Sequence, residues 1–348
     1  MSSVELQSGI ESFAAPLGYL AAASIGIPPR QAVDALAADL ALWSRGARDP
    51  QDYDAVIGRT RESYAAIVGV DVHRVAIGSQ TSVIASLIAA AVPDGAEVLC
   101  IDGDFSSMMF PFLQRIGIRV RVVPGEPLAD SITDDTWLVA FSLVQSATGV
   151  VADAAAIVEA ARRHGAHTFC DVTQAAGVFP VDARMFDATV CNTYKWLCAP
   201  RGVAFLTVTE AFAAELTPLQ AGWYAGEQVW TSTYGPAMTL ASDARRFDVS
   251  PVWPAWIGAE QSIALFASLD IGEVWRLTSG LGDELCERLG IAPQHQAIVT
   301  WPDSSGGDLA RLKAAGIRAA GRAGRLRASF HLWNTSADVD AVVAAIRS

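Results

Sequence analysis

The stretch "DVTQAAGVFPVDARMFDATVCNTYKWLCAPRGVAFLTV", residues 171–208, decides the fold of this chain. It contains two short apolar, β-branched runs, residues 187–193 and 203–208, and it begins where an earlier run of the same kind ends. Runs of this length between polar and turn residues are typical of buried strands. Asp171 ends one such strand, and Lys195 follows another. Because ligands of an open α/β sheet bind at the carboxyl ends of its strands, these two side chains are expected to converge.

The same alternation extends outward from this stretch. The other apolar runs that predict strands are residues 74–78, 96–102, 118–124, 136–142 and 166–172. Helical stretches such as residues 82–91 and 153–164 lie between several of them. Strand, helix and strand at this spacing predict an α/β fold with a mostly parallel central sheet and helices on both faces.

The pattern changes after Pro254. Helical periodicity over residues 256–290 is followed by a strand (297–301), a helix (307–316), a strand (325–333) and a final helix (336–348). This order predicts a smaller α+β domain at the C-terminus, with the boundary inside the first helical region. The expected division is an N-terminal segment packed near the site (1–25), a large domain (26–265) and a small domain (266–348).

The composition indicates a globular enzyme without nucleic-acid or membrane partners. The 348 residues are 51% hydrophobic and carry a formal charge of −12, which would repel a phosphate backbone. The N-terminus is acidic where a signal peptide would be basic, and no apolar stretch approaches the roughly 20 residues of a membrane span. We therefore expect a soluble, cytoplasmic protein.

The cysteines are expected to be free thiols, mostly buried. They are an odd number and lack the paired C-x-x-C spacing of a zinc site, so no metal site is expected. The five residues are Cys100, Cys170, Cys191, Cys198 and Cys286.

Lys195 is conspicuous because the chain almost always uses arginine. Among 25 basic residues only Lys195 and Lys313 are lysines. A guanidinium is effectively always protonated, whereas a lysine amine can be tuned to form a Schiff base. The alternative is that the lysine falls here by chance. For Asp171, the alternative is an ordinary helix cap or turn residue.

A third feature is the turn "GSQTS", residues 78–82, between a strand and a helix rich in Ala and Ile. Exposed N–H groups at a helix start form an anion site, although an ordinary N-cap would look the same. No dinucleotide or nucleotide glycine fingerprint is present. An amine, a carboxylate and a phosphate-binding turn on one sheet meet the requirements of pyridoxal 5'-phosphate, with Lys195 on the aldehyde and Asp171 on the pyridine nitrogen.

The opening stretch resembles the central signature of the class V aminotransferase family of fold type I pyridoxal-phosphate enzymes. That group includes cysteine desulfurases, kynureninases, isopenicillin N epimerases and C–S lyases. Weaker resemblances to other family segments lie at "GYLAAASIG" (18–26), "RRFDVSPVWP" (245–254) and "RLRASFHLWNT" (325–335). The resemblance implies the fold type I architecture and a pyridoxal-phosphate enzyme that acts on an amino acid.

The resemblance also implies residue roles. Lys195 would be the Schiff-base lysine and Asp171 the partner of the pyridinium. The other cofactor ligands would be Ser79, Gln80 and Tyr194 on the phosphate, Gln174 on the ring hydroxyl oxygen and Phe105 on the ring face. Ser250 would reach the phosphate of a neighbouring subunit, which implies a homodimer. Arg327 would bind the substrate α-carboxylate as a bidentate fork, with Ser146 beside the substrate.

Departures from the relatives narrow the expected reaction. Tyr194 and Phe105 stand where desulfurases carry His, a change that resembles the kynureninase and lyase branches, although core packing is an alternative for Phe105. No cysteine lies between Gly290 and Arg327, which disfavours persulfide chemistry. Gln174 replaces the His expected of a true kynureninase.

Lys195 is expected to remove the Cα proton of an amino acid, followed by β-elimination of a cysteine S-conjugate. Aminotransferase or epimerase chemistry are the alternatives, and a kynureninase, a desulfurase or a non-enzymatic binding module is less expected.

Residues 220–247 read as a long irregular segment over the active site. Trp223 and Tyr224, with Trp230, are expected to shape the substrate pocket. The alternative is that these aromatic residues lie in a dimer interface.

Overall fold

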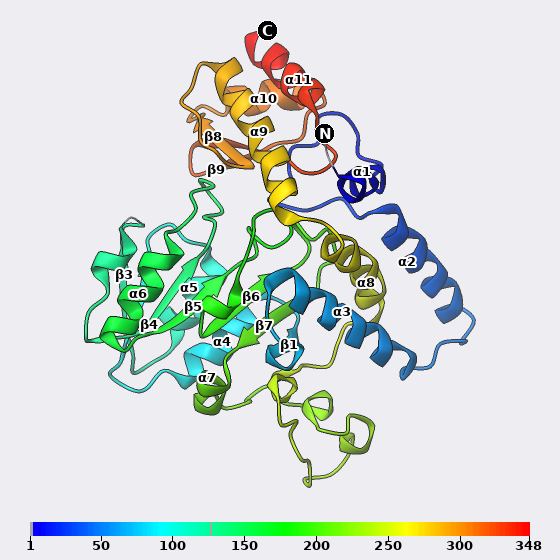
Figure 1. The fold of residues 1–348 in the computed structure, drawn as a ribbon, viewed down its shortest axis with the longest axis vertical. Helices are drawn as coiled ribbons and strands as arrows, with labels where there is room; N and C mark the ends of the chain where they lie inside the picture. The colour runs from blue at the N-terminus through cyan, green and yellow to red at the C-terminus, as the bar shows by residue number, and fades with distance from the viewer. Residues whose placement is uncertain (1–2, 126) are drawn as a thin grey trace.

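A seven-stranded sheet forms the centre of the molecule in the computed structural model, which describes residues 3–125 and 127–348 (Figure 1). In spatial order its strands are β1 (Val75–Gly78), β7 (Ala204–Val208), β6 (Ala188–Asn192), β5 (His167–Asp171), β4 (Thr136–Ser142), β2 (Glu97–Ile101) and β3 (Arg119–Val123). Neighbours run parallel except β7, which is antiparallel to both β1 and β6. The seven predicted strands and the mostly parallel sheet are confirmed.

Helices cover both faces of this sheet, because alternate strand residues point to opposite sides. Ile77, Phe141 and Phe205 belong to one buried cluster, which also draws on α3 (Asp52–Val68), α6 (Ala154–His164) and α8 (Trp253–Ala267). Val98, Phe169 and Leu206 belong to a second cluster with α4 (Thr81–Ala91), α5 (Ser106–Gln114) and α7 (Glu210–Glu215). The fold is therefore the expected three-layer α/β arrangement.

A three-stranded antiparallel sheet lies in the C-terminal part of the chain. Its order is β8 (Ile298–Pro302), β10 (Arg325–Ser329) and β9 (Ala320–Arg322), and it packs with α9 (Ile271–Leu289), α10 (Gly307–Ala314) and α11 (Ser336–Arg347). The sequence pattern does not predict β9. The long helical region divides between α8 and α9, where the Asp270 side chain accepts hydrogen bonds from the backbone N–H groups of Gly272 and Glu273. The exact domain boundaries stay a prediction.

The N-terminal segment connects the small sheet to the large domain. After α1 (Val4–Glu11), Tyr19 pairs with Arg318 and Ala21 pairs with Ser329 of β10. The Gly26 N–H then donates to the Tyr194 carbonyl at 2.9 Å. A Cβ atom at Gly26 would lie 2.0 Å from the Lys195 carbonyl oxygen, so this approach requires glycine. Next, α2 (Arg30–Trp43) packs on α8.

Residues 220–247 form an irregular segment beside α3, away from the small sheet (Figure 1). It contains short 3₁₀ turns at Trp223–Ala225, Trp230–Ser232 and Ala244–Phe247. The predicted lack of periodicity is thus confirmed. Across the described ranges, no helix is both long and apolar enough to cross a membrane.

Candidate active site

The carboxyl ends of β4, β5 and β6 meet at one edge of the large sheet. Ser142 pairs in register with Asp171, and Asp171 pairs with Val190, two residues before β6 ends at Asn192. The chain then turns back at once, because the Ala199 N–H donates to the Thr193 carbonyl at 3.1 Å. Lys195 stands in this turn. The expected convergence of Lys195 and Asp171 on one sheet edge is found.

A cavity of about 330 Å³ opens beside Lys195. Its walls come from the N-terminal segment, the ends of β2, β4 and β6, and the β9–β10 hairpin. Among the residues with predicted roles, Phe105, Ser146, Tyr194, Lys195 and Arg327 line it. Phe105 and Arg327 lie more than 200 positions apart in the chain, so it is the fold that brings the cavity together.

The Lys195 amine is buried and faces aromatic rings. Its Nζ lies 5.2 Å from the ring centre of Phe105 and 5.9 Å from that of Tyr194. Burial lowers the pKa of Lys195 to about 8, against the opposing effect of the Asp171 carboxylate, and the charge of Arg327 lowers it further. At pH 7 about a tenth of the amine is therefore neutral, far more than for an ordinary lysine, and the neutral amine is the form that attacks an aldehyde or accepts a proton.

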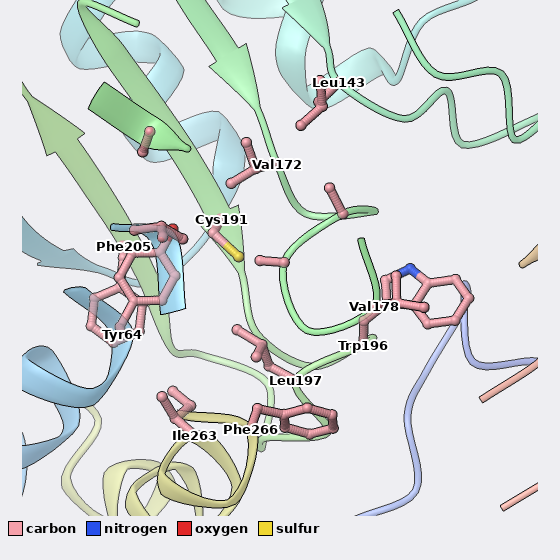
Figure 2. Close-up of a cluster of buried hydrophobic side chains, with 14 of the residues drawn as sticks. Tyr64, Leu143, Val172, Val178, Cys191, Trp196, Leu197, Phe205, Ile263 and Phe266 are labelled. Atoms are coloured by element: carbon pink, nitrogen blue, oxygen red, sulfur yellow. The ribbon is translucent and has the colours of Figure 1, made fainter. Parts of the chain in front are cut away.

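The residue after the lysine holds the turn in place. Figure 2 shows Trp196 and Leu197 within a cluster of buried side chains that also includes Val178 and Phe266. His331 Nε2 donates to the Trp196 carbonyl at 2.8 Å, because His331 Nδ1 accepts the Leu332 N–H at 2.7 Å and so leaves the ring proton on Nε2. The lysine turn is thereby tied to the loop that follows β10.

Trp196 also fixes the orientation of Gln174. The indole Nε1–H can only donate, and it donates to Gln174 Oε1 at 2.7 Å. The Gln174 Nε2 group is left as a donor, and it bonds to Ser146 Oγ at 2.9 Å and to the Ala23 carbonyl at 3.1 Å. Both N–H groups of the Gln174 amide therefore have acceptors, and its connection to the cavity runs through the lining residue Ser146. Its role as a ligand of the ring hydroxyl oxygen stays a prediction.

Asp171 is fully buried at the end of β5. Its Oδ1 accepts the Thr173 N–H at 2.8 Å, yet burial still raises its pKa to about 6. A carboxylate in such a site is stabilised by a protonated nitrogen as a partner. The pyridine ring of pyridoxal phosphate supplies that partner, so the residue fits the cofactor.

The start of α4 fits the phosphate end of the cofactor. Gln80 is the N-cap residue of this 11-residue helix, and its side chain makes no capping hydrogen bond. The first N–H groups of the helix are thus available to an anion, with the hydroxyls of Ser79 and Ser82 on either side of the cap. Asn192 Nδ2 donates to Thr81 Oγ1 at 3.3 Å, which joins this helix start to the end of β6.

Arg327 is almost fully buried, with 1% of its surface exposed, so it is not a solvated surface charge. Its Nη1 donates to the carbonyl oxygen and hydroxyl of Ser146, and its Nη2 donates to Ser24 Oγ at 2.7 Å. Burial lowers the pKa of Arg327 to about 10, still high enough to keep it charged at neutral pH. Its Nε is buried without a hydrogen-bond partner among the described residues. A carboxylate ligand would satisfy such a fork.

Asp104, Ser24 and Arg322 line the cavity but are not identified from the sequence. Asp104 accepts the Phe105 N–H at 2.7 Å and both the N–H and the hydroxyl of Ser142, at 2.9 and 2.6 Å. It therefore ties the backbone of Phe105 to the end of β4. Its position after a predicted strand, in "DGDF", is the signal that could have revealed it. Ser24 and Arg322 come from segments that only the fold brings together.

Other predicted residues lie outside this cavity. Trp223 and Tyr224 do not line it, and the Tyr224 hydroxyl instead donates to Asp54 of α3 at 2.8 Å. Ser250 is exposed beside the end of β1, where the Val249 N–H donates to the Ile77 carbonyl at 3.4 Å. Within one subunit these three residues do not contact a ligand at Lys195, so their roles stay predictions that require a second subunit.

Cysteine thiols and clusters of metal ligands are two further kinds of group that could take part in catalysis. All five cysteines are free and buried, as expected, and none lines the cavity. Within residues 3–125 and 127–348, no group of three or more His, Cys, Asp or Glu side chains is arranged to hold a metal ion.

Several known proteins are similar to this chain in sequence. The profile of the family described as Aminotransferase class-V matches residues 55–320. A kynureninase of Deinococcus radiodurans is 30% identical over 254 residues, which is 69% of this chain and 61% of that protein. An isopenicillin N epimerase of Streptomyces clavuligerus is 26% identical over 79% of this chain and 76% of that protein. The chain thus spans about three fifths of the length of the kynureninase it matches.

Solved structures share the fold. The cystine C-S lyase C-DES, in complex with cysteine persulfide, superposes with a TM-score of 0.86 at 21% identity, over 95% of this chain and 97% of that one. The cysteine desulfurase CsdA of Escherichia coli gives the same TM-score at 20% identity, over 99% and 98%. These likenesses confirm the predicted fold type I architecture.

The family match covers well over half of the chain, and it includes the lysine turn, Asp171 and the start of α4. The predicted family and the predicted cofactor, pyridoxal phosphate, are confirmed. The chain belongs to the class V aminotransferase family of pyridoxal-phosphate enzymes.

Proposed function

We propose that this protein is a lyase that eliminates the β-substituent of an S-substituted cysteine. The observation that carries the proposal is that Lys195 is, among the residues that the structure describes, the one charged lining residue suited to accept the Cα proton. Of the other charged lining residues, Asp104 is occupied by three hydrogen bonds, and a guanidinium has no acceptor site for a proton. Loss of a β-substituent needs one such base, whereas inversion at Cα also needs an acid on the opposite face.

Each site residue would have a distinct role in this reaction. Arg327 binds the α-carboxylate and so orients Cα toward the Lys195 amine. Asp171 would keep the ring nitrogen of the cofactor protonated, Gln174 would donate to the ring hydroxyl oxygen, and Phe105 would cover the ring. When bound, pyridoxal phosphate supplies the electron sink that stabilises negative charge at Cα.

The proposed elimination needs no oxidant or reductant, because each bond that breaks is matched by one that forms. Lys195 takes the Cα proton, the electron pair of that bond forms a Cα–Cβ double bond, and the Cβ–S bond breaks with its pair on sulfur. The thiolate acquires a proton and leaves. Water then hydrolyses the remaining three-carbon fragment, so an S-substituted cysteine and one water give a thiol, pyruvate and ammonium.

Release of a free thiol is supported over transfer to a protein cysteine. The β9–β10 hairpin that precedes Arg327 closes through only Ala323 and Gly324 between its strands. A sulfur acceptor would need a cysteine able to reach the cavity. Since the five thiols are buried and none lines the cavity, a persulfide relay is not supported.

Epimerisation of an amino acid is the second candidate. The similarity to the isopenicillin N epimerase of Streptomyces clavuligerus, over 79% of this chain, favours it. It would require a second proton donor, for which the half-buried Tyr194 hydroxyl is the available group. Transamination would end instead with the amino group on the cofactor.

We also propose a homodimer, because Ser250 is exposed beside the strand that leads into Ser79 and Gln80. In a dimer this hydroxyl could reach the phosphate of the neighbouring subunit, and the Trp223 segment could reach its substrate. A cytoplasmic location stays a prediction.

The test is to incubate the cofactor-loaded protein with a series of S-substituted L-cysteines and to measure pyruvate, ammonium and thiol. Equal amounts of the three products are expected. The same mixtures are analysed for the D-amino acid and for a keto acid that retains sulfur. Formation of the D-isomer or of that keto acid, without pyruvate, would replace elimination by epimerisation or transamination.

A further inference from the structure

The cavity beside Lys195 contains two guanidinium groups rather than one. Arg327 lies on β10. Arg322 is the last residue of β9, the strand that pairs with β10 in the same hairpin. Both donate to one hydroxyl group: Arg327 Nη2 lies 2.7 Å and Arg322 Nη2 lies 3.3 Å from Ser24 Oγ. Two like charges are thus held within reach of the same oxygen atom.

The hairpin keeps Arg322 at this position. Ala323 and Gly324 form a tight turn in which both residues have positive φ angles, 48° and 72°. This conformation is uncommon for alanine. Arg322 Nη1 also donates to the Gly321 carbonyl at 2.7 Å. The two arginines differ in depth, because Arg327 is buried at the inner end of the cavity and Arg322 is exposed at its rim.

Two guanidinium groups line the cavity, whereas a simple amino acid brings a single carboxylate. The one acidic lining residue in the described part of the chain, Asp104, already accepts hydrogen bonds from Ser142 and from the Phe105 N–H. An α-carboxylate neutralises one guanidinium. The deeper and better-oriented Arg327 is the one suited to it, so the Arg322 guanidinium at the rim is left for another anion. A second guanidinium at one cavity stands out in a chain with a net charge of −12.

We infer that Arg322 binds an anionic group on the side chain of the substrate, so that the preferred substrates are amino acids with a second acidic group. The inference rests on the proposed function in that Arg327 takes the α-carboxylate and Lys195 faces Cα. For an S-substituted cysteine, the class that fits is one whose sulfur carries a carboxyalkyl or similar anionic substituent. The negative end of the substrate then lies at the cavity rim, beside the exposed guanidinium.

Two ligands of nearly the same shape test the inference. S-carboxymethyl-L-cysteine carries a side-chain carboxylate, and S-carbamoylmethyl-L-cysteine carries the neutral amide in its place. Binding of each to the cofactor-loaded enzyme is followed by the change in the visible absorption of the cofactor, which reports occupancy whatever reaction follows. The wild-type protein should bind the carboxylate at least about tenfold more tightly, as expected for one charge-assisted pair.

Variants of Arg322 then test whether this residue causes the preference for the carboxylate ligand. Arg322→Gln should reduce the ratio of the two affinities to about one, while Arg322→Lys, which keeps the charge, should retain part of it. Arg318→Gln is the matched control, because it removes the same charge from an exposed residue that does not line the cavity. The wild-type ratio should persist in that control.

Three outcomes would overturn the inference: equal affinity of the wild-type protein for both ligands, no binding of either, or an equal loss of both in Arg322→Gln. The last result would mean that Arg322 binds the α-carboxylate that the ligands share. Pyruvate is measured in the same samples as a separate readout. If the affinity ratio depends on Arg322 but no pyruvate forms, β-elimination is wrong and the assignment of Arg322 stands.

Discussion

Two aromatic segments of this molecule look alike in sequence but differ in what they contact. Tyr194 to Trp196 and Trp223 to Trp230 each combine Tyr and Trp with polar neighbours. In the first, the Trp196 indole donates to Gln174, and the backbone carbonyl of Trp196 accepts from His331. In the second, Trp230 and Tyr224 both donate to Asp54 of α3, at 2.5 and 2.8 Å. The first segment belongs to the cavity and the second does not.

The difference shows that an aromatic cluster is informative about function only through its hydrogen-bond partners. Both segments bury aromatic surface, and Trp223 and Trp230 pack with ring centres 5.0 Å apart. Only in the first does an indole N–H fix a side chain, that of Gln174, which bonds to the cavity-lining residue Ser146. Single substitutions in each segment test this difference.

Replacing the lysine itself should give the largest effect. Lys195→Ala should lower turnover by at least about 10²–10⁴-fold, since the variant lacks the only suited base, while the far-UV spectrum stays that of a folded protein. Lys313→Ala, which changes an exposed residue of α10, serves as the control and should keep wild-type turnover. Borohydride reduction of the loaded wild-type enzyme should leave the cofactor attached at Lys195. An active Lys195→Ala enzyme would mean that Lys195, the reactive residue of the first segment, takes no part in the proton transfer.

The pH dependence of cofactor uptake should be the next largest effect. Because only the neutral amine attacks the aldehyde, and the pKa of Lys195 is lowered to about 8, the uptake rate should rise about tenfold per pH unit below that value. It should level off above pH 8. The measurement is stopped-flow absorbance after mixing the cofactor-free protein with pyridoxal phosphate. A rate that keeps rising to pH 10 would mean that the amine has the pKa of an ordinary exposed lysine.

The smallest effect, and the most direct contrast, comes from matched Trp→Phe changes. Trp196→Phe leaves the buried Gln174 Oε1 without its donor, so the free energy of unfolding should fall by about 1–3 kcal/mol. The absorption spectrum of the bound cofactor should also shift, since Gln174 is then free to reorient.

Trp230→Phe is the control for this change. Trp230 is 36% exposed and water can replace its bond to Asp54, so the loss should stay within about 1 kcal/mol, with an unchanged spectrum. Equivalent spectral changes in the two variants would mean that the first segment is no more closely connected to the cofactor site than the second. Chemical denaturation and absorbance of the loaded proteins measure both quantities.

Most of the fold can be predicted because the seven central strands are short apolar runs separated by turn residues. The register of apolar positions in β4 and β5 already specifies two buried faces. The pattern fails for β9, since its three residues, Ala320–Arg322, contain no alternating apolar positions and pair only because β10 is beside them. It also merges α8 and α9, because the short break before Asp270 lies inside continuous helical periodicity.

The candidate site is predictable where a residue type is chemically unusual. Lys195 stands out in an arginine-rich chain, and Asp171 is recognisable at a strand end. Ser24 and Arg322 are ordinary residue types in segments far apart in the chain, so only the three-dimensional contact between them reveals a role. The role of Ser250 rests on family resemblance, and those of Trp223 and Tyr224 rest on their place in a long irregular segment; a single subunit does not bring any of the three to the cavity.

The contact at Gly26 has a mechanical consequence. The eight residues from Tyr19 to Gly26 pair with the small sheet at one end and with the backbone of the lysine turn at the other. His331 makes a second link, from the loop after β10 to the same turn. A rotation of the small sheet that carried Arg327 away would therefore pull on both links at once. The group that anchors the substrate and the group that moves its proton are expected to shift together as one rigid piece.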